Sequence, residues 1–88
     1  MQVRNECFRC GSTYNLETHH VFYGKNRPLS DKYGLTVRLC PSCHRGKNGV
    51  HFNKGFNDKL KEFGQECFEA SHPRLDFVKV FGKNYKGV

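Results

Sequence analysis

The sequence predicts a small α+β domain with a β-hairpin, a short helix directly after it, and two further helices towards the C-terminus. Two Cys-x2-Cys pairs, at Cys7/Cys10 and Cys40/Cys43, lie on either side of the predicted hairpin. Apolar residues alternate in the first half of the chain and recur at helical spacing in the second half, which indicates strands and then helices. A chain of 88 residues forms one domain, 1–88, with a core motif at about 7–53 and a helical part at about 54–82.

The four paired cysteines predict a closed structural zinc site formed by Cys7, Cys10, Cys40 and Cys43. A chain this short buries little apolar surface and commonly needs a metal, disulfides or a partner for stability. The cysteine count of five is odd, and the first six residues lack the apolar core of a secretory signal. We therefore expect a reduced, cytoplasmic protein with zinc instead of disulfides. Since no apolar run approaches the length of a membrane span, we expect no membrane partner.

The charge is strongly basic, with fifteen Lys and Arg against eight Asp and Glu, a formal net charge of +7. Such an excess in a small domain suggests a polyanionic partner, most often nucleic acid. The alternative is a charge that only keeps the protein in solution, and the charge alone does not choose between the two.

The first half of the chain predicts a hairpin after the first cysteine pair. Gly11 follows that pair and suits a tight turn, because glycine accepts positive φ without strain. Residues 16–23 are rich in β-branched and aromatic residues and predict a strand. Residues 24–32 predict a polar, basic loop, since they contain glycine and proline, which favour turns and loops. Residues 33–39 predict the second strand, with Leu35, Val37 and Leu39 on one face.

The second half predicts three helices. Pro41 fits the first turn of a short helix that runs to about Arg45, because proline there loses no needed N–H. A longer helix follows residue 53, with an apolar stripe formed by Phe56, Leu60, Phe63, Cys67 and Phe68. A last helix is expected from Pro73, with an apolar set formed by Leu75, Phe77, Val78 and Phe81, and Gly82 as its C-terminal cap.

Four histidines, His19, His20, His44 and His51, lie close in sequence to the predicted zinc framework. Hydrolysis of a phosphodiester requires a deprotonated water and neutralisation of charge on the phosphate. A neutral imidazole can take the proton, and a divalent metal can stabilise the charge. Neighbouring side chains on a strand point to opposite faces, so one of the adjacent pair can bind metal while the other faces water. The alternative is a pair of structural histidines on a strand.

The chain resembles the HNH endonucleases, whose active site is the ββα-metal motif. The residues that carry this resemblance are Cys7-x2-Cys10, Glu17-Thr18-His19-His20-Val21 and Leu39-Cys40-Pro41-Ser42-Cys43-His44. Their order and spacing match the zinc-containing branch of the family. The later stretches 49–53 and 81–85 look like small phage- or prophage-encoded members, which implies a bacterial or phage-infected host cell.

The resemblance implies a DNA-cutting enzyme that leaves 3′-hydroxyl and 5′-phosphate ends. His20 matches the general base, and His19 occupies the slot where many members have a metal-binding aspartate. His44 matches the residue that completes the catalytic metal site. His51 resembles an additional ligand, although a structural or phosphate-binding role fits it equally well. The cysteines match the structural zinc ligands.

The chain departs from the family pattern at two points. The asparagine that pins the family's loop would fall near Leu35, where none stands, so Asn26 or Ser30 must replace it. With His19 in place of aspartate the site is richer in nitrogen, which suits Zn²⁺, Ni²⁺ or Mn²⁺ better than Mg²⁺. The catalytic divalent metal therefore stays open among these four ions.

Five basic residues are candidates for binding a phosphate backbone: Lys25, Arg27, Arg38, Arg45 and Lys47. The alternative is that they are solvated surface charges. The expected partner is DNA, and cleavage of both strands by one small site would require a homodimer or a phage or recombination partner protein. The competing hypothesis is a non-catalytic, zinc-stabilised nucleic-acid-binding module.

Overall fold

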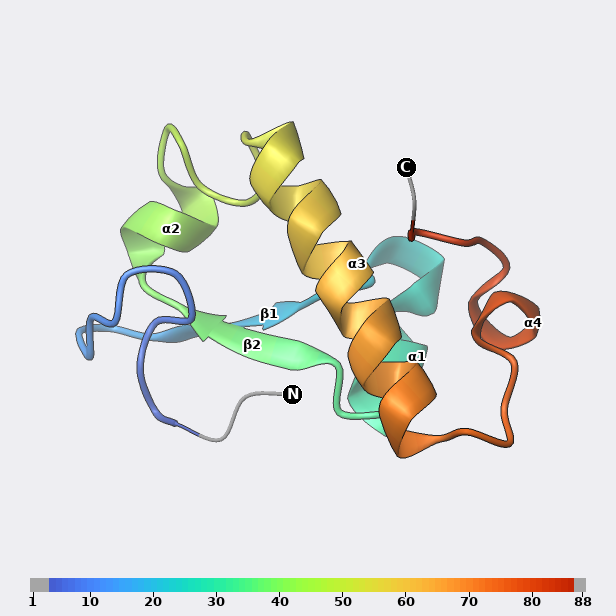
Figure 1. The fold of residues 1–88 in the computed structure, drawn as a ribbon. Helices are drawn as coiled ribbons and strands as arrows, with labels where there is room; N and C mark the ends of the chain where they lie inside the picture. The colour runs from blue at the N-terminus through green and yellow to red at the C-terminus, as the bar shows by residue number, and fades with distance from the viewer. Residues whose placement is uncertain (1–3, 87–88) are drawn as a thin grey trace.

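A computed structural model describes residues 4–86, and it confirms the α+β class. Residues 1–3, which entered the expectation of no secretory signal, lie outside the described residues. The elements, drawn in Figure 1, are β1 (Glu17–His20), the 3₁₀ turn η1 (Gly24–Asn26), α1 (Arg27–Lys32), β2 (Thr36–Leu39), α2 (Pro41–Arg45), α3 (Lys54–Ser71) and α4 (Phe77–Phe81). No helix within residues 4–86 is long and apolar enough to cross a membrane.

The hairpin forms as predicted, with shorter strands. β1 and β2 pair antiparallel, with His19 opposite Val37 and His20 opposite Thr36. The alternation holds, because Leu35, Val37 and Leu39 are all buried. The first strand ends at His20, and the chain then bends away from the ladder. The strand predicted over 16–23 was therefore too long at both ends.

The predicted loop at 24–32 is wrong, since these residues form η1 and α1. Pro28 lies in the first turn of α1, where a missing N–H leaves no bond unmade. Ser30 within α1 is completely buried, and its hydroxyl accepts from the Phe22 N–H and donates to the Phe22 carbonyl, both at 2.9 Å. Asn26 in turn donates to the Phe81 carbonyl at 3.2 Å. Of the two residues expected to pin this segment, Ser30 fastens it to the end of β1, and Asn26 fastens it to α4.

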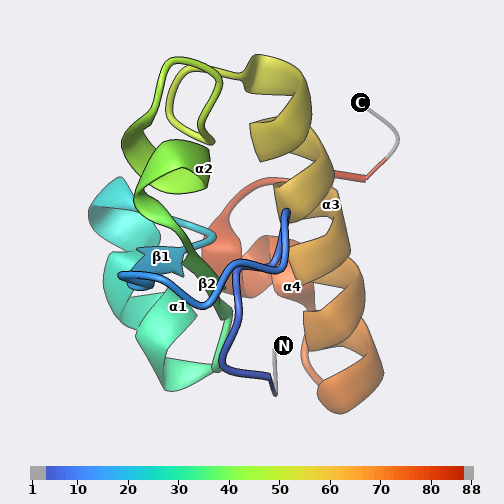
Figure 2. The ribbon, with the colours of Figure 1, turned by 90° about the vertical axis from the view of Figure 1, so that its left-hand side faces the viewer.

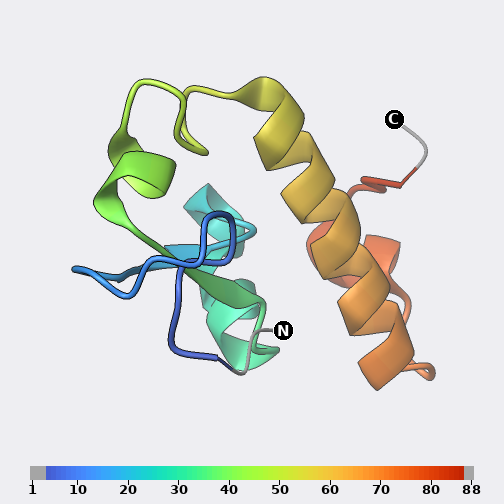
Figure 3. The ribbon, with the colours of Figure 1, turned by 60° about the vertical axis from the view of Figure 1, so that its left-hand side comes forward.

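Helix α3 packs against the end of the hairpin through a glycine. Asn53 caps its N-terminus by accepting from the Phe56 N–H at 3.0 Å. A Cβ on Gly64 would lie 3.0 Å from a Val21 methyl and 3.1 Å from the Phe22 ring, so any other residue here would require these side chains to shift by a few tenths of an ångström. Figures 2 and 3 show α3 on one side of the hairpin, and α2 at the end of the hairpin where β2 finishes.

The apolar stripe predicted for α3 is correct only in part. Leu60 and Phe68 are buried, but Phe63 is exposed and stacks on the exposed Phe8 with ring centroids 5.7 Å apart. Cys67 is half-buried on the same helix and packs against the core, as predicted.

The last helix begins later than predicted. Its N-cap is Asp76, whose carboxylate accepts from two backbone N–H groups of the first turn, while Pro73 lies in a preceding turn. Phe77 and Phe81 are buried, but the predicted core positions Leu75 and Val78 are exposed. The inward face of this five-residue helix is formed by Phe77 and Phe81, four residues apart, with the partly buried Val80. Gly82 ends the helix at φ +84°, as predicted.

Candidate metal centres

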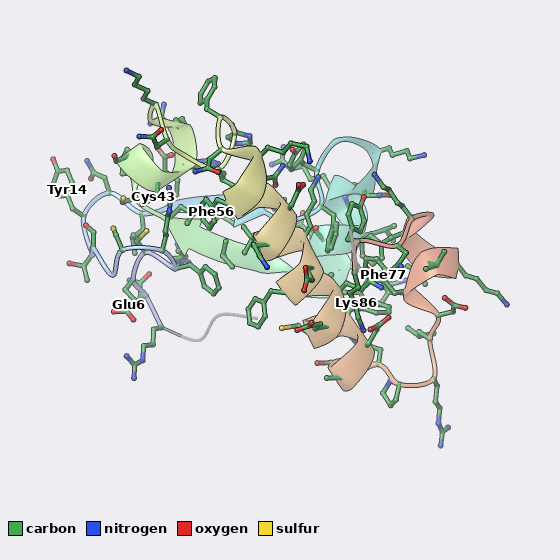
Figure 4. All side chains as sticks on the ribbon, turned by 45° about the horizontal axis from the view of Figure 1, so that its top comes forward. Glu6, Tyr14, Cys43, Phe56, Phe77 and Lys86 are labelled. Atoms are coloured by element: carbon green, nitrogen blue, oxygen red, sulfur yellow. The ribbon has the colours of Figure 1, made fainter. Side chains whose placement is uncertain are left out.

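The four predicted zinc ligands lie together. Cys7, Cys10, Cys40 and Cys43 place their sulfurs within 4.8 Å of one another, and all are free thiols. Figure 4 shows Cys43 on α2 facing the N-terminal loop that carries the first pair. The Sγ atoms of Cys10 and Cys40 are 3.6 Å apart. A tetrahedral zinc with bonds of about 2.3 Å holds its sulfurs about 3.8 Å apart, so this cluster has the size to hold such an ion.

The protonation chemistry of the thiols also fits a cation. Burial, followed by hydrogen bonds to the other three thiols, raises the pKa of Cys43 to about 12. Burial acts in the same direction on Cys7, but backbone hydrogen bonds from Cys40, Cys10 and Arg9 outweigh it and lower the pKa of Cys7 to about 6. Without a metal the cluster therefore does not carry four thiolates near neutral pH. A zinc site requires the thiolate form of its cysteines, and a bound divalent ion would stabilise the negative charge of these four thiolates.

A second group of metal-ligating side chains forms from His19, His44 and His51, whose ring nitrogens lie within 4.8 Å of one another. These are the three histidines for which a catalytic metal was predicted. Nε2 of His51 and Nε2 of His44 are 3.2 Å apart. Ring nitrogens on one tetrahedral ion with bonds of about 2.0–2.1 Å lie about 3.3 Å apart, so the pair already has the separation of two ligands.

His19 supplies the strongest sign that this cluster suits an ion. Its side chain is 2% exposed, and its buried Nε2 has no hydrogen-bond partner. Such a nitrogen costs free energy unless something occupies it. Burial, followed by the neighbouring His44 and His51, lowers the pKa of His19 to about 4. The ring is therefore neutral near pH 7 and holds the lone pair that a metal requires.

Glu17 orients one of these ligands, and the sequence patterns did not assign it a role. Its carboxylate accepts a hydrogen bond from Nδ1 of His44 at 2.7 Å, which leaves Nε2 of that ring as the ligating nitrogen. The same carboxylate binds the guanidinium of Arg45 in a fork, at 3.0 and 2.5 Å. Glu17 lies two residues before His19, on the same face of β1, and this strand periodicity was the signal that could have revealed it.

His20 has a different partner from His19 and is not part of the three-histidine cluster. Its Nε2 lies 2.7 Å from the carboxylate of Asp31 in α1, so Nε2–H donates and Nδ1 keeps a lone pair. Asp31 lay in the predicted loop, where no local pattern connects it to a histidine eleven residues earlier. Its position depends on the helical turn that the sequence prediction missed.

The three-histidine cluster and His20 line one cleft of about 300 Å³. Its walls are Thr18, His19, His20, Tyr23, Arg27, His44 and His51. The adjacent pair from β1, the residue after the fourth cysteine and the later His51 thus meet around a single space. A water and a phosphate are small enough to enter a space of this volume.

The loop that carries His51 is fastened to the cysteine cluster. The Val50 N–H donates to the Cys43 carbonyl at 2.8 Å, and Arg9, between the first two cysteines, donates to the Asn48 carbonyl at 2.6 Å. Arg9 also lies over the Phe56 ring at 4.4 Å. An ion held by the cysteines would therefore fix both His44, which follows Cys43, and the loop bearing His51.

The five predicted phosphate-binding residues are all exposed, but they are not equivalent. Arg27 lines the histidine cleft. The guanidinium of Arg45 already donates to the Glu17 carboxylate through Nε and Nη2. Lys25, Arg38 and Lys47 are exposed on η1, on β2 and after α2, outside the walls of that cleft.

Comparison with known proteins does not assign the chain to a family: no protein-family model, curated protein or solved structure matches it.

Proposed function

We propose that this protein is a metal-dependent DNA endonuclease of the HNH type, a phosphodiester hydrolase. The observation that carries the proposal is the cleft in which His19, His44 and His51 form a three-nitrogen cluster beside His20. The hairpin followed directly by α2 is the arrangement that the ββα-metal resemblance implies, and the net charge of +7 suits a polyanionic substrate.

In this proposal His20 is the general base. Its Nε2–H is held by Asp31, which fixes the ring and leaves Nδ1 to accept the proton of an attacking water. The carboxylate also stabilises the imidazolium that results. The expected gain from such a base is about 10²–10⁴ in rate.

His19, His44 and His51 hold the catalytic divalent ion, with Glu17 fixing the orientation of His44. When bound, the ion supplies charge neutralisation at the phosphate and the leaving oxygen. Three nitrogens favour Zn²⁺, Ni²⁺ or Mn²⁺ over Mg²⁺. Arg27, on the wall of the same cleft, contacts a non-reacting phosphate oxygen.

The test is relaxation of supercoiled plasmid by the zinc-loaded protein, with Mg²⁺, Mn²⁺, Ni²⁺ or Zn²⁺ added in turn. His20→Ala should slow nicking by about 10²–10⁴-fold. His72→Gln is the matched control, because His72 lies at the end of α3 and outside the cleft. Equal nicking by His20→Ala and the native chain would remove His20 from the reaction.

Metal counting separates the nuclease from the non-catalytic zinc module. A nuclease should hold one zinc tightly and a second, exchangeable ion that is lost in His51→Ala. A module that only binds nucleic acid should hold one zinc and bind DNA in a salt-dependent way, without nicking by any of the four ions.

A further inference from the structure

A second cleft, of about 320 Å³, lies along α3 next to the C-terminal segment. Four lysines and Tyr85 line it together with Gly55, Asp58 and Glu62; the lysines are Lys54, Lys59, Lys61 and Lys83. Three of the lysines come from one helix, and the fourth comes from the segment after α4. None of them was among the predicted phosphate-binding residues.

Lys61 connects this cleft to the histidine cleft. Its ammonium lies 4.5 Å from the centre of the Tyr23 ring and 5.5 Å from the centre of the Tyr85 ring. Tyr23 forms a wall of the histidine cleft, and Tyr85 forms a wall of the lysine cleft. The positive charge of Lys61 therefore lies where the two clefts adjoin.

The tyrosines and the C-terminal segment are held in place from α3. Asn57 donates to the Tyr23 hydroxyl at 2.9 Å. The buried Gln65 accepts from the Tyr85 N–H at 2.7 Å and donates to the Asn84 side chain at 2.8 Å. Lys83 precedes this anchored pair, and its ammonium lies 5.3 Å from the centre of the Tyr85 ring. The cleft is thus built on a rigid helix, although one of its lysines lies far along the chain.

Asp58 lies among these lysines, and the shift of its pKa indicates a positive electrostatic environment in the cleft. Its carboxylate accepts from Lys54 at 2.6 Å. The hydrogen bond from Lys54 is the main cause that lowers the pKa of Asp58; burial opposes it, and the charges of Lys54, Lys61 and Lys83 lower the pKa further. Four lysines against two acids leave the lining with a positive excess that a polyanion would complement.

We propose that this lysine cleft binds the sugar-phosphate backbone of the DNA strand that continues from the scissile phosphate in the histidine cleft. The position of Lys61 where the two clefts adjoin gives the strand its path, and the charge of the lining gives it affinity. Tyr23 is 42% exposed and lies between the two clefts, in contact with Lys61 on one side and lining the histidine cleft on the other. The inference rests on the proposed nuclease function, because it takes DNA as the occupant.

The test measures binding of a fluorescently labelled DNA duplex by the zinc-loaded His20→Ala chain, without a second metal, over a range of salt concentrations. Lys61→Gln/Lys83→Gln should lower the slope of log affinity against log salt by about 2 and weaken binding by about tenfold or more. The control Arg74→Gln/Lys79→Gln removes the same charge from exposed positions outside the cleft and should change affinity by less than about threefold.

Asp58→Asn provides an independent arm, since it removes an acid from the cleft and should tighten binding severalfold. Equal losses in the two double variants, or no gain in Asp58→Asn, would overturn the cleft as a DNA site. Polyglutamate that displaces DNA from the cleft at equal phosphate and carboxylate concentration would also overturn it, in favour of an acidic protein partner. The nuclease proposal fails separately, when His20→Ala nicks as fast as the native chain.

Discussion

The Glu17 carboxylate lies 2.7 Å from Nδ1 of His44, and the two residues belong to different elements, β1 and α2. This contact fixes which nitrogen of His44 faces His19 and His51. A carboxylate behind a ligating histidine raises the basicity of the ring and holds its orientation. The arrangement therefore couples the first strand to the geometry of the second candidate metal site.

Glu17→Gln should weaken binding of the second ion by about 10–100-fold, because the amide keeps the shape but loses the charge behind His44. The measurement is competition for Zn²⁺ or Mn²⁺ against a fluorescent chelator, with the cysteine site already filled. Glu66→Gln, an exposed acid on α3, is the control and should leave the affinity unchanged. Unaltered affinity in Glu17→Gln would show that the charge of Glu17 does not strengthen metal binding through His44.

Removal of the metal from the cysteine cluster should unfold the protein. Structural zinc contributes on the order of 10–16 kcal/mol, whereas a small domain has a total stability of about 5–15 kcal/mol. Cys10→Ser should therefore lose the zinc and much of its circular dichroism signal. Cys67→Ser is the matched control, because Cys67 lies on α3 outside the cluster, and it should bind one zinc and stay folded. A native spectrum after complete zinc removal would contradict this role.

Asp31→Asn should slow nicking by at least about tenfold while leaving metal binding intact, because the amide no longer stabilises a protonated His20 and permits the wrong tautomer. The measurement is the nicking rate as a function of pH, together with the metal count. A purely structural Asp31 would change the melting temperature and leave the pH profile of the remaining activity unchanged.

Ser30→Ala should destabilise the fold by about 1–3 kcal/mol, because it leaves the Phe22 N–H and carbonyl buried without partners. For a chain of this size that is a fall of roughly 4 °C or more in melting temperature. Ser71→Ala, at the exposed end of α3, is the control. If both variants melt at the native temperature, Ser30 does not hold α1 to the hairpin.

The sequence by itself determined the features that depend on short-range spacing. The Cys-x2-Cys pairs predicted the cysteine cluster, and the apolar alternation predicted the hairpin whose first strand carries His19 and His20. The prediction of α2 from Pro41 to Arg45 is confirmed, because a proline at its start and a glycine after its end delimit it. Each of these signals lies within a few residues of the feature that it predicts.

Only the tertiary structure decided which partners surround the histidines. The helical turn over Arg27–Lys32 brings Asp31 to His20, although glycine and proline there suggested a loop. The path of α3 brings Lys61 beside Lys83, a residue that follows α4. These contacts depend on burial of Ser30 and Gln65 against distant backbone groups, and no local periodicity records such long-range hydrogen bonds.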